Sequence, residues 1–339
     1  MQKNFKAMLW EKEEGEKVRC NLCAHRCLIE EGKRGICGVR ENREGELSTL
    51  VYGRAIATHV DPIEKKPLFH FLPGSRAFSV ATVGCNMTCL HCQNADISQS
   101  PRQGNVIAGQ EISPRKLVEE AKKYDCRTIA YTYTEPTIFF EYAYDTARLA
   151  REEGIKNIFV TNGYMTKEAI DTISPYLDGA NVDLKSFRDD FYRRICGARL
   201  EPVLETIKKM KEKGIWVEVT TLVIPEHNDS PGELEELARF VCEVSPDIPW
   251  HVSAFYPTYK LTSVGSTPIS TLRRARDIGL GVGLSYVYTG NIPGDDGENT
   301  FCPSCGKKII SRSGYRVGSI HLRDGRCEFC EATIAGVWE

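Results

Sequence analysis

The feature that most constrains the fold is an alternation of short apolar runs with amphipathic runs between residues 76 and 290. The apolar runs are rich in β-branched residues, as expected of strands buried on both faces of a sheet. We predict six strands, at residues 78–83, 127–132, 156–160, 179–184, 215–223 and 250–255. Helical patterns lie between them, one of which begins after Ser113, a typical cap, with Pro114 at its first position. This alternation predicts an α/β fold with a parallel sheet and right-handed crossovers.

Three cysteines follow the first predicted strand, in the pattern Cys85-x-x-x-Cys89-x-x-Cys92. Three thiols this close in sequence can face one point, and thiolates are the usual ligands of iron–sulfur clusters. Three ligands on a four-iron, four-sulfur (4Fe–4S) cluster leave one iron open to a small chelating molecule. The alternatives are a zinc site and scattered buried thiols, but zinc knuckles usually consist of two C-x-x-C pairs. We interpret the intervening His91 as a packing residue rather than a ligand.

Two further cysteine groups have metal-ligand spacing. The first matches a zinc ribbon, in which four thiolates surround a structural ion, and consists of Cys302, Cys305, Cys327 and Cys330. The second fits structural zinc and an auxiliary iron–sulfur cluster, with zinc slightly favoured, and consists of Cys20, Cys23, Cys27 and Cys37. The other three of the 14 cysteines, Cys126, Cys196 and Cys242, are isolated, and we predict that they are inert buried thiols.

Composition limits the class of protein and of partner. The 44 Lys and Arg residues nearly balance 46 Asp and Glu residues, so no global charge favours nucleic acid or anionic membranes. No signal peptide and no apolar run of about 18 residues is visible, which predicts a cytoplasmic protein without a membrane partner. We expect three parts: an N-terminal Cys-rich segment at 1–75, a barrel at 76–290, and a zinc-ribbon-like module at 291–339.

Polar residues gather where the predicted strands end. Each of them has an alternative structural explanation, as a turn, a helix-end charge or an ion pair. The carboxyl ends of parallel strands meet at one edge of the sheet, however, and active sites form there. The candidate site residues at these ends are Glu135, Asn162, Gly163, Asp183, Lys185 and His251.

The three-cysteine motif resembles that of the radical S-adenosylmethionine (SAM) enzymes. The resemblance implies a partial (β/α)₆ barrel and a catalytic 4Fe–4S cluster on Cys85, Cys89 and Cys92. It also implies that the amino and carboxylate groups of SAM occupy the open iron. Reductive cleavage would then give methionine and a 5′-deoxyadenosyl radical that abstracts hydrogen from a substrate. A flavodoxin or ferredoxin would supply the electron.

Most of the middle part is similar to the pyruvate formate-lyase activating enzymes, which implies roles for the strand-end residues. Glu135 would lie where the SAM ammonium group is received, and Asn162 and Gly163 near the methionyl and ribose portions. The segment Thr134-Glu135-Pro136 departs from the Gly-Gly-Glu often found in that family.

The same resemblance gives roles to the later strand ends. Asp183 and Lys185 would contact the ribose or the carboxylate of SAM. His251 would approach the nucleoside.

Nearly the whole chain is similar to the radical SAM member of the AmmeMemoRadiSam group. The segments that carry this similarity are 61–68, 84–94, 131–136, 288–294 and 334–338. The resemblance implies Memo-family and AMMECR-family proteins as partners and leaves the substrate undefined.

Three functions therefore remain open from the sequence. The first is hydrogen abstraction from an unidentified substrate by a radical SAM enzyme. The second is activation of a glycyl-radical enzyme, in which the substrate is a backbone glycine of a protein. The third is not enzymatic: a zinc-stabilised adaptor for protein or nucleic acid, in which Cys85, Cys89 and Cys92 hold zinc or nothing.

Overall fold

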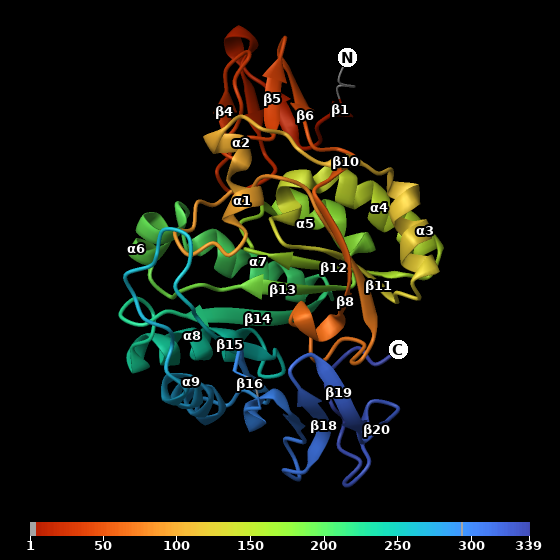
Figure 1. Ribbon diagram of the computed structural model, residues 1–339, viewed down its shortest axis with the longest axis vertical. Coiled ribbons are helices and arrows are strands. Elements are labelled where there is room, and N and C mark those ends of the chain that lie inside the picture. The colour runs from red at the N-terminus through yellow and green to blue at the C-terminus, as the bar shows by residue number, and fades with distance from the viewer. Residues whose placement is uncertain (1–4, 293) are drawn as a thin grey trace.

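One eight-stranded sheet organises the protein, for which a computed structural model describes residues 5–292 and 294–339 (Figure 1). The strand order is β16-β15-β14-β13-β12-β11-β9-β8. All neighbours are parallel except β8, which runs antiparallel to β9 at the edge. The strands are β8 (Ala57–Pro62), β9 (Arg76–Ala81), β11 (Thr128–Tyr131), β12 (Lys156–Thr161), β13 (Gly179–Asp183), β14 (Trp216–Val223), β15 (Trp250–Ala254) and β16 (Val287–Gly290).

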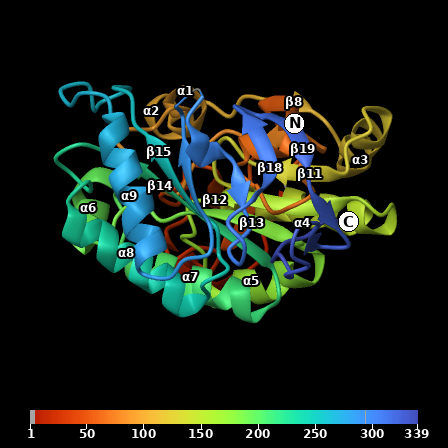
Figure 2. The same cartoon turned by 90° about the horizontal axis from the view of Figure 1, so that it is seen from below.

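Helices connect the parallel strands and cover the outer face of the curved sheet (Figure 2). The longer ones are α3 (Pro114–Lys123), α4 (Phe140–Glu152), α5 (Lys167–Ile173), α7 (Glu201–Glu212), α8 (Pro231–Val244) and α9 (Ile269–Gly281). Helix α3 begins as the sequence predicts, because the Ser113 hydroxyl accepts a hydrogen bond from the Lys116 backbone N–H at 3.3 Å. Three short helices are α1 (Ala95–Ser98), α2 (Ser100–Gln103) and α6 (Asp189–Phe191).

The α/β fold class predicted from the sequence is confirmed, and all six predicted strands are present within one or two residues of their expected bounds. The sequence missed the strands at the two ends of the sheet. β8 belongs to the predicted N-terminal segment, yet its residues Ala57–Pro62 pair with β9. β16 adds a seventh parallel strand beside β15.

Small sheets lie at the two ends of the barrel (Figure 1). The N-terminal ones, at the top of the view, contain β1 (Phe5–Lys6), β2 (Trp10–Lys12), β3 (Val18–Cys20), β4 (Leu28–Ile29), β5 (Arg40–Arg43) and β6 (Glu46–Thr49), while β7 (Arg54–Ala55) pairs with β10 (Gln110–Glu111). The C-terminal ones, at the bottom, contain β17 (Thr300–Phe301), β18 (Lys308–Ser313), β19 (Arg316–Ile320), β20 (Leu322–Arg323) and β21 (Arg326–Cys327).

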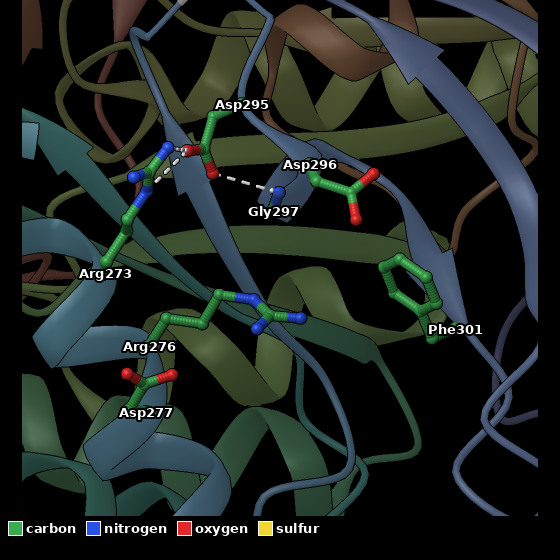
Figure 3. Close-up of a pocket in the computed structure, with 7 residues that line it drawn as sticks. All are labelled: Arg273, Arg276, Asp277, Asp295, Asp296, Gly297 and Phe301. Atoms are coloured by element: carbon green, nitrogen blue, oxygen red, sulfur yellow. Dashed lines mark hydrogen bonds and ion pairs between the residues drawn. The ribbon is translucent and has the colours of Figure 1, made fainter.

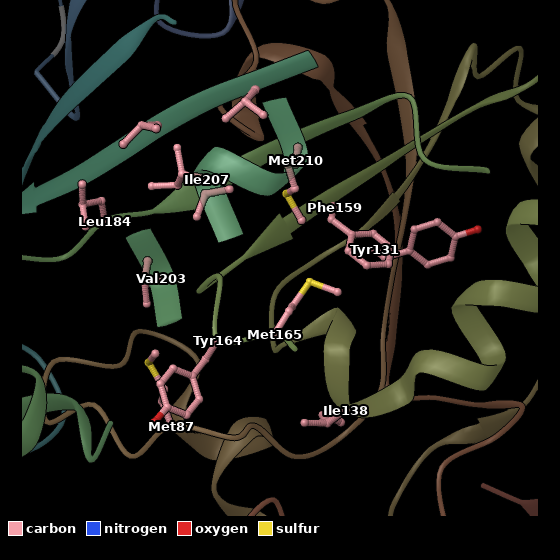
Figure 4. Close-up of a cluster of buried hydrophobic side chains, with 14 of the residues drawn as sticks. Met87, Tyr131, Ile138, Phe159, Tyr164, Met165, Leu184, Val203, Ile207 and Met210 are labelled. Atoms are coloured by element: carbon pink, nitrogen blue, oxygen red, sulfur yellow. The ribbon is translucent and has the colours of Figure 1, made fainter. Parts of the chain in front are cut away.

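Buried apolar side chains join the sheet to its helices and to the loop after β9 (Figure 4). Met87 from that loop and Tyr164 from the loop after β12 are 1% and 3% exposed. Met210 of α7 and Phe159 of β12 are fully buried in the same cluster. The loop that carries the three-cysteine motif is therefore anchored to the core of the barrel.

The lower opening of the barrel is closed by the segment that precedes β9. The Glu218 carboxylate, fully buried on β14, accepts hydrogen bonds from the backbone N–H groups of Phe69 and His70 at 2.9 and 2.8 Å. Val337 covers this segment, with its N–H bonded to the His70 carbonyl and its carbonyl accepting from Leu72 N–H, both at 2.7 Å. Residues 69–72 and Val337 thus cover the amino ends of the parallel strands.

Candidate active site and metal centres

The loop after β9 holds the three-cysteine motif in a fixed shape. Gly84 has φ +101°, and a Cβ there would lie 2.7 Å from Val39 Cγ1 and 3.2 Å from the Cys37 carbonyl oxygen, so only glycine fits. The backbone N–H groups of Thr88 and Leu90 donate to the carbonyls of Cys196 and Ile195 at 2.8 and 2.9 Å. The loop is therefore fixed on one side by the N-terminal sheets and on the other by residues 195–196.

Arg102, which follows this loop on α2, binds its carbonyl groups. Its Nη2 donates to the Cys85 carbonyl at 2.6 Å and its Nη1 to the Met87 carbonyl at 2.8 Å. A guanidinium group therefore stabilises the turn and places positive charge beside the thiols.

Each of the three thiols has a polar neighbour. Cys85 Sγ lies 3.4 Å from Met87 N and 3.7 Å from Asn162 Nδ2, and Cys92 Sγ lies 3.3 Å from Ser98 Oγ. A hydrogen bond with Cys196, and then burial, raises the pKa of Cys89. Burial also raises the pKa of Cys85 and of Cys92. These thiols become ligands by losing their protons as a metal binds.

In the part of the chain that the structure describes, Cys85, Cys89 and Cys92 do not form a single-ion group of the kind that the C-terminal cysteines form. A zinc–sulfur bond of about 2.3 Å places ligands on one tetrahedral ion about 3.8 Å apart. Among the described residues, only the C-terminal cysteines have sulfurs that all converge within 4.8 Å. A cluster takes each thiolate on a different iron, which requires a wider spacing. The buried Nδ1 of His91 also has no partner within the protein, which leaves a polar group for a bound species.

Glu135 ties the end of β11 to the end of β12. Its Oε1 accepts from the Thr161 hydroxyl at 2.8 Å, and its Oε2 from the Asn162 backbone N–H at 2.8 Å. The backbone N–H of Thr137 also donates to Oε1, at 3.0 Å. Burial raises the pKa of Glu135 against the opposing effect of these bonds. Protein donors occupy both carboxylate oxygens, so in this structure the side chain positions Asn162.

The structure places Asn162 and Gly163 beside the thiol loop. Asn162 Nδ2 donates to Asn86 Oδ1 at 2.8 Å, and Asn162 Oδ1 accepts from Tyr164 N at 3.0 Å. Gly163 has φ +70°, and a Cβ there would lie 2.8 Å from Val182 Cγ1. The tight turn after β12 therefore directs the Asn162 amide toward Cys85.

Asp183 and Lys185 form an ion pair at the end of β13, with 2.8 Å between Lys185 Nζ and Asp183 Oδ2. The Asp183 side chain is 37% exposed, and the charge of Lys185 acts on the pKa of Cys89. Thr220 stands opposite Asp183 on β14, and its hydroxyl has no partner. The pair therefore faces the open end of the barrel beside the thiol loop.

His251 occupies a different environment from these residues. It is in register with Thr220, but its Nε2 lies 2.6 Å from Glu218 Oε2 and its ring contacts Phe69 and Tyr288. The side chain is fully enclosed at the barrel floor. Its observed contacts are with protein groups that close the lower opening.

Sequence reasoning missed two features. The first is Cys196, an isolated cysteine with no spacing signal, which lies against Cys89. The second is at the sheet edge, where Asp61 of β8 accepts at Oδ2 from Lys66 Nζ at 2.6 Å, from Ser79 Oγ at 2.8 Å and from the Tyr133 hydroxyl. Burial lowers the pKa of Lys66 to about 8. Asp61 and Lys66 lie in the segment 61–68 that carries the family resemblance, which was the available signal.

The C-terminal four cysteines converge as a single-ion site requires. The Cys302 and Cys330 sulfurs lie 3.6 Å apart, and the Cys305 and Cys327 sulfurs 3.8 Å apart. Both distances match the edge of about 3.8 Å expected for a tetrahedral zinc–thiolate site. All four sulfurs lie within 4.8 Å of one another, so this module can bind a metal ion.

A cavity of about 480 Å³ lies elsewhere, between α9 and the segment after β16 (Figure 3). Its charged groups are largely satisfied, because Arg273 Nε binds Asp295 at 3.0 Å and Arg276 Nε binds the Val287 carbonyl at 3.1 Å. The cavity contains no thiol and is separate from the candidate site.

Comparison with known proteins identifies the family. The model of the Radical SAM superfamily matches residues 79–241, from β9 into α8. Uncharacterized protein MJ0808 of Methanocaldococcus jannaschii is 47% identical over 331 residues, which cover 97% of this chain and 98% of that protein. The chain contains a Radical SAM domain. This domain indicates an enzyme and favours radical chemistry over the adaptor alternative.

One further relative agrees with this match, and one solved structure shows a similar fold. Pyruvate formate-lyase 1-activating enzyme of Escherichia coli (strain K12) is 26% identical over 225 residues, which cover 61% of this chain and 89% of that enzyme. The crystal structure of Streptococcus suis SuiB bound to precursor peptide SuiA has a TM-score of 0.52 at 15% identity, covering 68% of this chain and 52% of SuiB. Among the described residues, no helix is both long and apolar enough to span a membrane.

Proposed function

We propose that the protein reductively cleaves SAM and uses the resulting radical to abstract hydrogen from a substrate held over the open end of the barrel. The observation that carries the proposal is the position of Cys85, Cys89 and Cys92 on a fixed loop at the carboxyl edge of the parallel sheet. When bound there, a 4Fe–4S cluster with SAM supplies one-electron cleavage to methionine and a 5′-deoxyadenosyl radical.

The thiol-loop residues would hold the cluster and tune it. Cys85, Cys89 and Cys92 would each ligate one iron, which keeps one iron open. Asn162 Nδ2, 3.7 Å from Cys85 Sγ, would donate to a sulfur, and hydrogen bonds to sulfur adjust cluster potentials. Arg102 would offset negative charge on the loop through its contacts with the Cys85 and Met87 carbonyls.

The strand-end residues would bind and orient SAM. Lys185, paired with Asp183, would place a positive charge near the SAM carboxylate, and Asp183 would accept from the ribose hydroxyls. Glu135 would act by holding the Asn162 and Gly163 turn in place. His251 would act through the barrel floor, because its Nε2 is bound to Glu218.

The class of substrate has two candidates. One is a substrate of unidentified class. The other is a backbone glycine of a partner enzyme, as in glycyl-radical activation, and the similarity to the Escherichia coli activating enzyme over 89% of its length favours it. Transfer of a radical to a partner glycine would give an electron paramagnetic resonance (EPR) signal on the partner.

We further propose membership of the AmmeMemoRadiSam group, with a flavodoxin or ferredoxin as electron donor and Memo-family and AMMECR-family proteins as partners. The proposal rests on the five segments that carry the resemblance, and within 61–68 Asp61 and Lys66 form a buried ion pair. For the C-terminal module we propose structural zinc on Cys302, Cys305, Cys327 and Cys330, which the tetrahedral sulfur spacing supports.

The test is anaerobic. The protein is reconstituted with iron and sulfide, reduced and mixed with SAM, and 5′-deoxyadenosine is measured by mass spectrometry alongside the effect of SAM on the cluster EPR spectrum. The variant Cys85→Ala/Cys89→Ala/Cys92→Ala should give neither nucleoside nor a SAM-dependent spectrum. Cys242→Ala, a thiol bonded only to the Val282 carbonyl, is the matched control and should keep both. A fully loaded wild-type cluster that shows no response to SAM would contradict the proposal.

A further inference from the structure

The N-terminal cysteines form a compact buried set against the catalytic loop. Cys20, Cys23 and Cys37 are each less than a tenth exposed, and Cys27 is half-buried. Their thiols are mutually close, because the Cys20, Cys27 and Cys37 thiols all act on the pKa of Cys23. The backbone fixes this arrangement: Cys20 N donates to the Cys27 carbonyl at 2.9 Å.

The sulfur spacing of this set differs from that of the zinc-like module. The C-terminal sulfurs converge within 4.8 Å, with pairs at 3.6 and 3.8 Å, as ligands of one ion do. The N-terminal cysteines lie entirely within the described residues and do not converge in this way. Four close thiols that do not gather as the ligands of one ion do suit a cluster, in which each corner iron takes its own ligand. This difference favours a cluster over the zinc that the sequence slightly favours.

A buried arginine supplies the second independent observation. Arg40 is 1% exposed, and its Nη1 donates to Cys20 Sγ at 3.1 Å. Its Nη2 binds the Glu141 carboxylate and the Met8 carbonyl. Its Nε atom has no partner within the protein. A guanidinium directed at a ligand sulfur favours an anionic centre and tunes its potential, as hydrogen bonds to cluster sulfurs do.

The set is also in direct contact with the loop of Cys85. The Ala24 N–H donates to the Tyr164 carbonyl at 3.3 Å, and His25 Nε2 lies 2.7 Å from the Asn86 carbonyl oxygen. Arg102 bridges the two thiol sets, because it donates both to the Cys85 carbonyl and to the Ile36 carbonyl next to Cys37. Hydrogen bonds thus connect the segments that carry the two thiol sets.

We propose that Cys20, Cys23, Cys27 and Cys37 hold a second iron–sulfur cluster, ligated entirely by protein, that exchanges one electron with the catalytic site. The role in electron exchange rests on the proposed function, whereas the presence of the cluster does not. In the exchange, the second cluster loses one electron and the catalytic cluster gains it, with no atom transferred. A low-potential one-electron donor, such as a reduced flavodoxin or ferredoxin, restores the reduced state.

The experiment uses the full chain without its catalytic ligands. In Cys85→Ala/Cys89→Ala/Cys92→Ala, reconstituted with iron and sulfide in the presence of zinc, we expect about two or about four irons per chain with matching sulfide, depending on the cluster type. An EPR signal should appear on reduction and should not change when SAM is added. Zinc in place of iron, with no reducible signal, would overturn the proposal and would leave SAM cleavage by the wild type unaffected.

A second measurement tests the proposal even if the triple cysteine variant does not fold. The wild type should bind more than the roughly four irons that three catalytic cysteines can organise, and Cys20→Ser/Cys37→Ser should lose only the excess. Cys126→Ser, an isolated buried thiol, is the matched control and should retain all the iron. In the doubly reduced wild type, coupling between the two neighbouring centres should broaden the EPR signal relative to the sum of the single centres. A wild type with four or fewer irons and an unbroadened signal would refute the second cluster.

Discussion

The N-terminal sheets should depend on one buried ion pair. Arg40 and Glu141 have side chains 1% and 2% exposed, and Glu141 Oε1 also accepts from Met8 N at 2.7 Å. Glu141→Ala removes the partner of a buried guanidinium, which costs about 3–5 kcal/mol. With an m-value of about 3 kcal/mol per molar urea, the unfolding midpoint should fall by about 1–1.7 M.

The control is Glu236→Ala, which breaks the pair between Arg188 and Glu236, whose side chains are 44% and 50% exposed. An exposed pair contributes up to about 1 kcal/mol, so the midpoint should shift by at most about 0.3 M. The variant Glu141→Gln removes the charge but keeps a hydrogen-bond acceptor, because an amide oxygen at Oε1 can still accept from Arg40 and Met8. Its unfolding midpoint should lie between those of Glu141→Ala and Glu236→Ala. Equal midpoints for Glu141→Ala and Glu236→Ala would refute the reasoning. All three are measured by urea titration of tryptophan fluorescence.

Three further outcomes follow from the structure. Burial lowers the pKa of His70 to about 4 in the folded protein, whereas the pKa of a histidine in the unfolded chain is about 6.5. The free energy of unfolding should therefore keep its full value above about pH 6.5 and fall by about 2 kcal/mol by pH 5. Urea midpoints at pH 7 and pH 5 measure this loss, which His70→Phe should abolish; an unchanged loss in that variant would count against it. In Glu135→Gln the new amide group can turn its N–H donors toward the Asn162 N–H, which removes one charged hydrogen bond. The affinity for SAM, measured by equilibrium dialysis, should therefore fall about tenfold, while the iron content stays unchanged. Cys302→Ser should release one metal ion per chain and lower the thermal midpoint, because a structural ion contributes folding free energy; retained metal would exclude the four-thiol site.

The sequence predicted the positions of the central strands, which are buried along most of their length, but it did not predict the strands at the two edges of the sheet. Residues 216–223 and 250–254 are mostly buried, as strands with neighbours on both sides are. β8 has the sequence Ala-Thr-His-Val-Asp-Pro, and it pairs on one side only, so its residues include exposed and charged ones. β16 has four residues, too few for a periodic pattern.

Within the site, the sequence predicted which residues lie at the ends of the strands, but it did not predict the direction in which their side chains point. Asn162 and Asp183 face the thiol loop because each lies at the carboxyl end of a strand. His251 lies at the second position of β15 and is in register with Thr220, but its ring binds Glu218, an acid that no local pattern marked as its partner. Cys196 ends the π-helical segment Tyr192–Cys196 after α6 and meets Cys89 there, a tertiary contact that spacing does not encode.

The barrel floor has a consequence for the order of assembly during synthesis. His70 Nδ1 pairs with the Ala335 carbonyl across 265 residues of chain, and Val337 bridges Phe71 beside it. A ribosome adds about 5–20 residues per second, so His70 waits roughly 15–50 s for this partner. Late in that interval, once β15 (Trp250–Ala254) has been made, the strands around the thiol loop are all present, while residues 335–337 are still missing from the lower end. The lower end of the barrel is therefore covered only after its parallel strands have been made.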